Sequence, residues 1–375
     1  MRIPFNDSAG SSLGIEMELQ IVDRLTRGLA SAATPLLAEL AAGPEKNAAK
    51  VKHELFECTV EVITGINMTV AEARADLAAT LDGVTAQADR RGLGLLCSGS
   101  HPFSPWHEQQ ISPDPRYADL VTEMQWAARR LQIFGVHFHV GVRSSAKAIA
   151  IANGLTAYLP YFLALSASSP YWSGHDTGMA SCRSTVFEAL PTAGLPYPMA
   201  DWEEFEQFMT TLVAARAIST IREVWWDIRP HPDFGTVELR MCDGITSLRE
   251  VAALAALAQS AVEHLDRRLD AGAEVAVPRD WVVRQNKWRA ARHGLAAEVI
   301  VDDHGSLAPL TSAVSDLVEE LMPVAASLGC DAELAHNLAI VEDGASYQRQ
   351  RRLVAAGGSL ADVVDSLVHE LEADR

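Results

Sequence analysis

Residues 13–23 read Leu-Gly-Ile-Glu-Met-Glu-Leu-Gln-Ile-Val-Asp, and the rest of the chain can be interpreted outward from this stretch. Its apolar positions, such as Ile21, predict a half-buried β-strand. Residues i and i+2 of a strand share a face, so Glu16 and Glu18 point one way and Met17 points the other. Two carboxylates about 4 Å apart repel by about 1 to 4 kcal/mol, depending on the dielectric. The pair therefore predicts either a solvated strand face or a site for a cation.

The composition is typical of a folded protein, and the net charge argues against one class of binding partner. The chain has 375 residues, of which 48% are hydrophobic and 21% charged, enough for one large or two ordinary domains. Its net charge of −18 argues against sequence-independent binding of nucleic acid, which needs a basic surface. The cysteines lack a Cys-x-x-Cys pair, which indicates a reducing compartment; they are Cys58, Cys97, Cys182, Cys242 and Cys330.

Two stretches bear on location. Residues 1–10 contain no apolar segment typical of a signal peptide. The Ala-rich stretch 251–262 is too short to span a bilayer. We therefore expect a cytoplasmic protein with no membrane partner and no nucleic-acid partner.

Periodicity and turn residues predict the order of elements. Alternation predicts strands at 13–23, 52–63, 94–98 and 133–142, and a hairpin within 223–242. Helical spacing predicts helices at 34–42, 69–91, 119–132, 146–168 and 202–217, and mainly helices from 248 onward. Loops are expected at 101–117 and 169–201, the second ordered by its aromatic residues. This pattern predicts one α+β domain over residues 1–375, with catalytic strands mainly in 13–243 and a helical part at 248–375.

A second acidic motif lies in residues 53–62, which read His-Glu-Leu-Phe-Glu-Cys-Thr-Val-Glu-Val. An uninterrupted strand would place Glu57 and Glu61 on one face and Glu54 on the other. A bulge would instead bring Glu54 and Glu61 into one site. A charged strand edge without a ligand explains the motif as well.

A pair of histidines marks residues 135–142, which read Gly-Val-His-Phe-His-Val-Gly-Val. His137 and His139 share a strand face, and the residues between and around them are apolar. Neutral imidazole is a metal ligand, and protonated imidazole is a donor to phosphate. A single histidine here would more often be a satisfied core residue, but two at this spacing favour a binding role.

A fourth motif combines acid and base within residues 228–243, Ile-Arg-Pro-His-Pro-Asp-Phe-Gly-Thr-Val-Glu-Leu-Arg-Met-Cys-Asp. Glu238 and Arg240 share a strand face, which places a possible metal ligand beside a guanidinium that can bind phosphate. Arg229 lies just before the turn. An ordinary surface ion pair is the alternative interpretation.

Taken together, the four motifs predict one site for divalent cations and phosphate. Carboxylates with few imidazoles and no thiolate suit Mg²⁺ or Mn²⁺ rather than structural zinc. Paired cations neutralise a nucleotide triphosphate, and arginines hold the transferred phosphoryl group. The chain lacks the P-loop pattern G-x-x-x-x-G-K-[ST] and any well-placed G-x-G-x-x-G.

These residues resemble the type 2 glutamate–cysteine ligases, also called YbdK-type carboxylate–amine ligases, of the glutamine synthetase-like superfamily. The similar motifs cover most of the chain and lie at 14–23, 53–65, 134–142, 176–196 and 224–243, with a weaker match at 285–294. The family often has three consecutive glutamates where this chain has Glu16-Met17-Glu18. Because Met17 faces away from the predicted site, this departure should leave metal binding intact.

The resemblance implies a fold and a set of ligands. The fold is an antiparallel sheet that cups ATP and divalent ions, with helices on its outer side. One ion would be held by Glu16, His137 and Glu238, and the other by Glu18, Glu54 and Glu61, with Glu57 as a weaker alternative to Glu54. His139 and Arg240 would lie near the nucleotide phosphates. Three arginines would face the phosphoryl group or the substrate carboxylate: Arg183, Arg229 and Arg240.

The resemblance also implies a two-step reaction. A substrate carboxylate attacks the γ-phosphorus of ATP to give an acyl phosphate, and an amine then displaces phosphate to form an amide. Glutamate and cysteine are the expected substrates, with another carboxylate or amine as the first alternative. A non-catalytic nucleotide-binding homologue is the second alternative. The apolar segment 146–168 could pack in the core or support a homodimer.

Overall fold

The computed structural model describes residues 2–43 and 47–374, and its centre is one antiparallel sheet. The strands of this sheet are β1 Leu13–Asp23, β2 Val51–His53, β3 Thr59–Ile63, β4 Leu93–Leu96, β5 Val136–Gly141, β8 Ile228–His231 and β9 Thr236–Leu239. Their order is β2-β3-β1-β5-β9-β8, and β4 pairs with the C-terminal half of β1. Two short hairpins lie apart from it: β6 Tyr171–Trp172 with β7 His175–Asp176, and β10 Glu298–Ile300 with β11 Leu307–Pro309.

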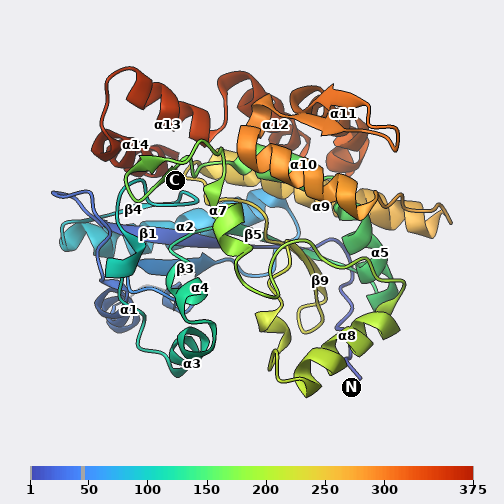
Figure 1. The fold of residues 1–375 in the computed structure, drawn as a ribbon, viewed down its shortest axis with the longest axis horizontal. Helices are drawn as coiled ribbons and strands as arrows, with labels where there is room; N and C mark the ends of the chain where they lie inside the picture. Colours follow the sequence, from blue (N-terminus) through green and yellow to red (C-terminus); the bar gives the residue numbers. More distant parts are fainter. Residues whose placement is uncertain (1, 44–46, 375) are drawn as a thin grey trace.

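Helices surround this sheet. The first half of the chain supplies α1 Ala33–Ala42, α2 Val70–Arg90, α3 Pro115–Met124, α4 Trp126–Arg129, α5 Ser145–Leu155, α6 Leu159–Ser166 and α7 Cys182–Phe187. The second half supplies α8 Trp202–Ala214, α9 Leu248–Asp270, α10 Asp280–His293, α11 Leu310–Leu328, α12 Asp331–Asp343, α13 Ser346–Ala355 and α14 Leu360–Asp374. Single 3₁₀ turns are η1 Ala48–Lys50, η2 Trp106–Glu108, η3 Ile221–Glu223 and η4 Gly294–Ala296. In Figure 1 the C-terminal helices gather above the sheet, and α3 and α8 lie below it.

The two faces of β1 explain the layering. Ile15, Met17 and Leu19 are at most 2% exposed and belong to the main hydrophobic core, whereas the glutamates between them are half-buried on the other face. Helices α2, α5 and α9 pack against the sheet and cover the apolar face. The predicted α+β class, an antiparallel sheet with helices on its outer side, is confirmed.

Several predicted boundaries hold because local chemistry fixes them. Helix α2 begins where expected, because the Thr69 side chain accepts from the Glu72 N–H in a capping box. The 223–242 hairpin is present as β8 and β9, with Gly235 at a φ of +64° in the turn between them. An alanine at position 235 would also place its Cβ 1.6 Å from the Asn6 carbonyl oxygen, so the turn requires glycine there.

Three predicted elements are divided in the structure. The single strand expected over 52–63 is wrong: β2 and β3 pair with each other as a hairpin, and residues 54–58 connect them. The helix expected over 119–132 begins earlier, at Pro115, and breaks into α3 and α4 at Gln125, which has a φ of +46°. The helix expected over 146–168 divides into α5 and α6, with Pro160 in the first turn of α6.

The predicted loops are ordered. Residues 169–201 contain the β6–β7 hairpin and helix α7, and Ser169 forms a β-bridge with Ser181 within this segment.

Among the described residues, no single helix is both long and apolar enough to cross a membrane. In the part of the chain that the structure describes, only α5 and α6 taken together reach the required length and composition, and they meet at 64°. Their buried residues pack against α9 and α10, so the apolar segment is part of the core.

Candidate active site

The polar face of the sheet carries most of the residues singled out from the sequence. In an antiparallel sheet, directly opposite residues point to the same side. Glu16 therefore shares its face with His137, its partner on β5. Two longer rows cross the sheet on the same face: Lys52, Glu61 and Glu18 on β2, β3 and β1, and His139, Glu238 and Arg229 on β5, β9 and β8.

The first candidate metal cluster combines two carboxylates and one imidazole. Ligand atoms of Glu16, His139 and Glu238 lie within 4.8 Å of one another. His139 Nε2 is 3.1 Å from Glu16 Oε1 and 3.7 Å from Glu238 Oε1. His139 takes this place because it, and not His137, lies opposite Glu238 in the β5–β9 register.

His137 lies beside this cluster. Its Nδ1 is 3.3 Å from Glu16 Oε2, and its Nε2 is 3.5 Å from a guanidinium nitrogen of Arg183. The sequence placed His137 in the first metal cluster and His139 near the nucleotide phosphates, whereas in the structure His139 lies in the cluster and His137 beside Arg183. Since both imidazoles contact Glu16, either can reach a cation bound by that carboxylate.

The second candidate metal cluster consists of three half-buried carboxylates, those of Glu18, Glu54 and Glu61, with ligand atoms within 4.8 Å of one another. Glu54 reaches the cluster because the chain leaves β2 there and does not continue as a strand. Glu57 does not join it, because its carboxylate accepts hydrogen bonds from the hydroxyl and N–H of Thr34 at 2.6 and 3.2 Å.

The crowding of carboxylates shifts their pKa values in opposite directions. For Glu16, burial alone would raise the pKa, but the nearby imidazoles of His139 and His137 lower it well below its usual range. For Glu18, burial and the charge of Glu54 raise the pKa to about 7. Burial also raises the pKa of Glu54, and burial with the charges of the other glutamates raises that of Glu61. A divalent cation would relieve this repulsion, so the donor set fits Mg²⁺ or Mn²⁺.

Glu238 is fully buried and held by two arginines. Arg229 donates from Nε and a terminal nitrogen to Glu238 Oε2 at 2.9 and 2.6 Å, and Arg240 donates to Oε1. Burial opposes ionisation, but the two guanidinium groups lower the Glu238 pKa well below its usual range. The carboxylate is therefore an anion, as a metal ligand must be.

Arg183 enters the site from α7, within the segment 169–201 that was predicted as an ordered loop. Its guanidinium donates to the carbonyls of Arg240 and Met241 at 3.2 to 3.4 Å. Gly135 makes room for it, because a Cβ at that position would lie 2.3 Å from the Arg183 nitrogen. The Asp243 carboxylate accepts from Ser169 and Ser181, and so holds the start of α7 against the end of β9.

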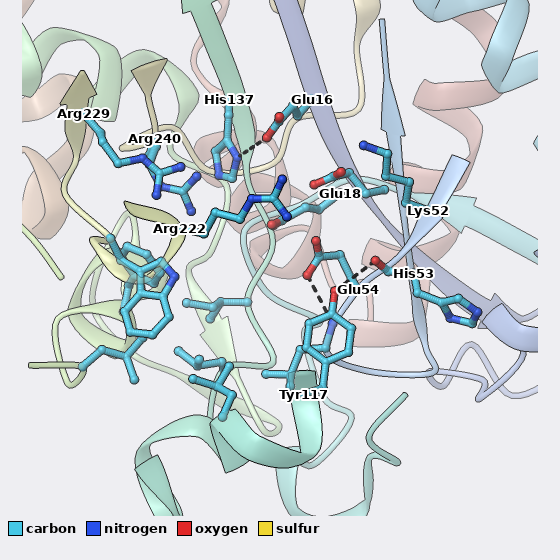
Figure 2. A pocket seen from close by; sticks show the side chains of 18 of the residues that line it. Glu16, Glu18, Lys52, His53, Glu54, Tyr117, His137, Arg222, Arg229 and Arg240 are labelled. Carbon is cyan, nitrogen blue, oxygen red and sulfur yellow. Dashed lines mark hydrogen bonds and ion pairs between the residues drawn. The ribbon is translucent and has the colours of Figure 1, made fainter. Parts of the chain in front are cut away.

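One cavity of about 300 Å³ is lined by both histidines, by the site arginines and by all the cluster carboxylates except that of Glu238 (Figure 2). Several of its residues were not singled out as site residues from the sequence: Lys52, Arg116, Tyr117, Arg222 and Trp225. They come from β2, from α3, and from η3 and the residues just after it, so only the fold brings them together. Part of the wall is apolar and is formed by Leu120, Leu131, Ile133, Phe187 and Leu190. The cavity thus combines an anionic floor, several guanidinium groups and an apolar side.

Aromatic rings form part of the cavity wall. His231 and Phe234 stack with centroids 4.1 Å apart, and His139 lies edge-on to Phe234 at 5.6 Å. Burial and the charge of Arg229 lower the His231 pKa to about 4, so this imidazole stays neutral. The stack presents a flat apolar surface beside the first cluster.

Two solved structures share this fold. A glutamate–cysteine ligase of Francisella tularensis, crystallised in complex with AMP, superposes with a TM-score of 0.71 at 13% identity, covering 99% of this chain and 90% of that one. A bifunctional glutathione synthetase of Pasteurella multocida gives a TM-score of 0.68 at 14% identity, covering 97% of this chain and 52% of that one. The chain therefore shares the fold of these two proteins.

The family follows from sequence comparison. The model of glutamate–cysteine ligase family 2 matches residues 12–366. A Frankia casuarinae protein named "Putative glutamate–cysteine ligase 2-1" is 57% identical, covering 100% of this chain and 99% of the relative. A Thermobifida fusca protein named "Putative glutamate–cysteine ligase 2" is 52% identical, covering 100% of this chain and 94% of the relative. The chain belongs to glutamate–cysteine ligase family 2, and it is an ATP-dependent ligase that forms C–N bonds.

Proposed function

We propose that this ligase joins the γ-carboxylate of glutamate to the amine of cysteine, with ATP converted to ADP and phosphate. The observation that carries the proposal is the pair of acidic clusters side by side on one face of the sheet, with guanidinium groups in the same cavity. Family membership supports glutamate and cysteine as substrates.

In this proposal the two clusters hold two divalent cations. Glu16 and Glu238 with His139, and with His137 within reach, would bind the first; Glu18, Glu54 and Glu61 would bind the second. When bound, Mg²⁺ or Mn²⁺ neutralises the charge of the triphosphate and of the phosphoryl group in transfer. The spacing of Glu16 and Glu18 on one strand face sets the two sites next to each other.

The chemistry proceeds by activation of a carboxylate. A glutamate carboxylate oxygen attacks the γ-phosphorus, and the bond from phosphorus to the ADP oxygen breaks, which gives γ-glutamyl phosphate. The cysteine nitrogen then attacks the acyl carbon, phosphate departs with the electrons of the C–O bond, and the nitrogen loses a proton. Arginines near the transferred group, such as Arg183 and Arg240, offset the repulsion between the two anions.

The apolar side of the cavity supports a second candidate within the same reaction class. Leu120, Leu131 and Ile133 offer no hydrogen bond or charge to the amine substrate. This wall therefore also suits an amine whose apolar side chain is not that of cysteine. The choice of amine is therefore the point that an assay has to settle.

The test is release of ADP by the protein with Mg²⁺, ATP and glutamate, with a panel of amines added singly. Turnover with cysteine and formation of γ-glutamylcysteine support the proposal, and turnover only with another amine supports the second candidate. With glutamate labelled by ¹⁸O in the γ-carboxylate, we expect one labelled oxygen in the released phosphate. Absence of ADP with every amine would favour a non-catalytic nucleotide-binding protein.

We further propose that the chain acts as one catalytic domain in the cytoplasm. One apolar core extends from Leu13 to Leu371, which supports a single folding unit. The five cysteines are free and buried, which is consistent with a reducing compartment. A homodimer stays a prediction, to be tested by light scattering of the purified protein.

A further inference from the structure

Arg222 differs from Arg183, Arg229 and Arg240, which also line the cavity. It lies in η3, its residue is exposed, and its side chain lines the cavity. Within residues 2–43 and 47–374, the Arg222 guanidinium has no hydrogen bond or ion pair; only its backbone N–H is bonded, to Thr220 Oγ1 at 3.2 Å. Figure 2 shows its side chain extending toward the middle of the cavity, with Arg240 on one side and Glu54 on the other.

The guanidinium of Arg229, in contrast, is occupied by protein groups. Besides the two bonds to Glu238, its remaining terminal nitrogen donates to the carbonyls of Ile221 and Val224 at 3.1 and 3.0 Å. All three nitrogens of Arg229 are thus engaged, and the residue is only 5% exposed. It ties η3 to the buried metal-binding carboxylate and has little left to offer a substrate.

The backbone beneath Arg222 is fixed from further directions. Glu223 closes a capping box with the N–H of Thr220 at 3.3 Å. The Thr192 hydroxyl donates to the Glu223 carbonyl at 2.5 Å, and the Trp225 N–H donates to the Thr192 carbonyl at 3.0 Å. A side chain with a free charge therefore stands on a rigid turn, which is the arrangement expected of a preorganised anion-binding group.

We propose that Arg222 is a catalytic residue that binds anionic oxygens of the reacting substrates, and that Arg229 is a positioning residue that acts through η3. The proposal rests on the proposed ligase function. The shared ligand chemistry is an oxyanion, supplied either by the triphosphate or by the substrate carboxylate. Arg183 and Arg240 donate to protein carbonyls or to Glu238, so Arg222 is the guanidinium of these four with no protein partner in the described chain.

The first experiment compares Arg222→Gln and Arg222→Lys with Arg216→Gln. Arg216 is exposed, follows α8 and does not line the cavity, so its variant removes the same charge outside the site. We expect Arg222→Gln to lower kcat/KM about 100-fold, Arg222→Lys to restore part of it, and Arg216→Gln to match the parent enzyme. A change in KM for ATP or in KM for glutamate identifies the source of the oxyanion. Equal kinetics of Arg222→Gln and Arg216→Gln would overturn the proposal.

The second experiment is a double-mutant cycle with Arg229→Lys, which retains a charge beside Glu238 but loses the bonds to η3. If Arg229 acts through Arg222, Arg229→Lys lowers kcat/KM strongly in the parent enzyme and less than threefold in the Arg222→Gln background. Equal losses in both backgrounds would refute the positioning role. Mn²⁺ affinity should be similar in Arg222→Gln and the parent, because Arg222 supplies no ligand atom to either cluster.

Calorimetric titration with ATP and with glutamate tests the role of Arg222 separately from the proposed ligase function. If the parent protein shows no turnover with any amine, the proposed function fails, and the affinities of the parent and Arg222→Gln for ATP and for glutamate still test the role of Arg222. Weaker binding of either ligand to Arg222→Gln supports an oxyanion contact. The same affinities in both proteins, together with equal kinetics where turnover exists, exclude it.

Discussion

At the scale of single residues, Glu16 joins the two histidines of β5 to the first metal cluster. Its carboxylate contacts both imidazoles, His137 through one oxygen and His139 through the other, and belongs to the first metal cluster. Its neighbour Glu18 belongs to the second cluster and accepts from the Gly135 N–H. The i, i+2 spacing on β1 therefore places one carboxylate in each cluster.

Replacing Glu16 with glutamine should abolish turnover and leave the fold intact. The amide keeps the shape of the side chain but removes the negative charge that a divalent cation needs. We expect kcat below about 1% of the parent value, with an unchanged circular dichroism spectrum. Glu57→Gln is the matched control, because Glu57 belongs to the second acidic motif but bonds to Thr34 outside the clusters. Full activity of Glu16→Gln would disprove the metal assignment.

The buried His101 should make the free energy of unfolding depend on pH in the acidic range. It is 1% exposed, its Nδ1 accepts from the Ser104 N–H at 3.0 Å, and its Nε2 lies 2.9 Å from the Arg27 carbonyl. Burial lowers its pKa from 6.5 to about 4. Because the folded pKa lies below the unfolded one, the contribution to stability is complete above pH 6.5 and is lost as the pH falls toward 4.

From these two values, the free energy of unfolding should fall by about 2 kcal/mol through His101 between pH 7.5 and pH 5. The measurement is urea unfolding at both pH values for the parent and for His101→Asn, whose side-chain oxygen can still accept from Ser104. We expect the parent to lose about 2 kcal/mol more than the variant over this interval. The same loss in both proteins would mean that the imidazole is not the titrating group.

At the scale of elements, the hairpin of β2 and β3 shows what a strand pattern leaves undetermined. The alternation in residues 52–63 correctly predicted a strand at each end of this stretch. The break at residues 54–58 depends on the pairing of β2 with β3 and on hydrogen bonds to other segments of the chain. The Glu57 N–H, for example, donates to the Gln110 carbonyl at 2.9 Å. This break turns Glu54 toward Glu61. Of the two arrangements considered for this motif, only the one with a bulge predicted that the two carboxylates meet.

The start of β5 provides an element-scale prediction. Gly135→Ala would place a methyl group 2.3 Å from the Arg183 guanidinium and 2.9 Å from His137 Nε2. Because the end of a flexible side chain can move aside, we expect turnover to fall about 10- to 100-fold with little change in Tm. Gly10→Ala is the control, since nothing lies within 4 Å of its added methyl group. Unchanged turnover of Gly135→Ala would show that Arg183 is not needed where the structure places it.

At the scale of the whole molecule, the acidic clusters couple cation binding to stability. Glu18, Glu54 and Glu61 repel one another in the free protein, so a divalent cation binds the folded chain in preference to the unfolded one. At 100 times the dissociation constant, such binding adds about 2.7 kcal/mol. With an unfolding entropy of about 2.1 cal/mol/K per residue, this raises Tm of the 375-residue chain by about 3 °C.

The check is differential scanning fluorimetry with Mg²⁺ or Mn²⁺, before and after addition of EDTA. A Glu16→Gln/Glu18→Gln variant serves as control, because it keeps the cavity but loses one ligand charge from each cluster. We expect the cation to raise Tm of the parent, EDTA to reverse the change, and the variant to respond weakly. An equal response of parent and variant would place the cation elsewhere.

The sequence by itself determined the layers and the list of charged residues. Alternation along β1 separates Met17 from Glu16 and Glu18, and the same rule pairs His137 with His139, and Glu238 with Arg240, because strand geometry has a period of two residues. The helical C-terminal part was equally accessible, because helix caps and spacing are local.

Only the tertiary structure decided which of these side chains meet. The register of β5 against β9 places His139 and not His137 opposite Glu238, and one residue pair along a strand suffices to exchange them. Arg222 enters the cavity from the 3₁₀ turn η3, which Arg229 positions through the Ile221 carbonyl. Register and loop packing depend on contacts between distant segments, and no local pattern in the chain encodes them.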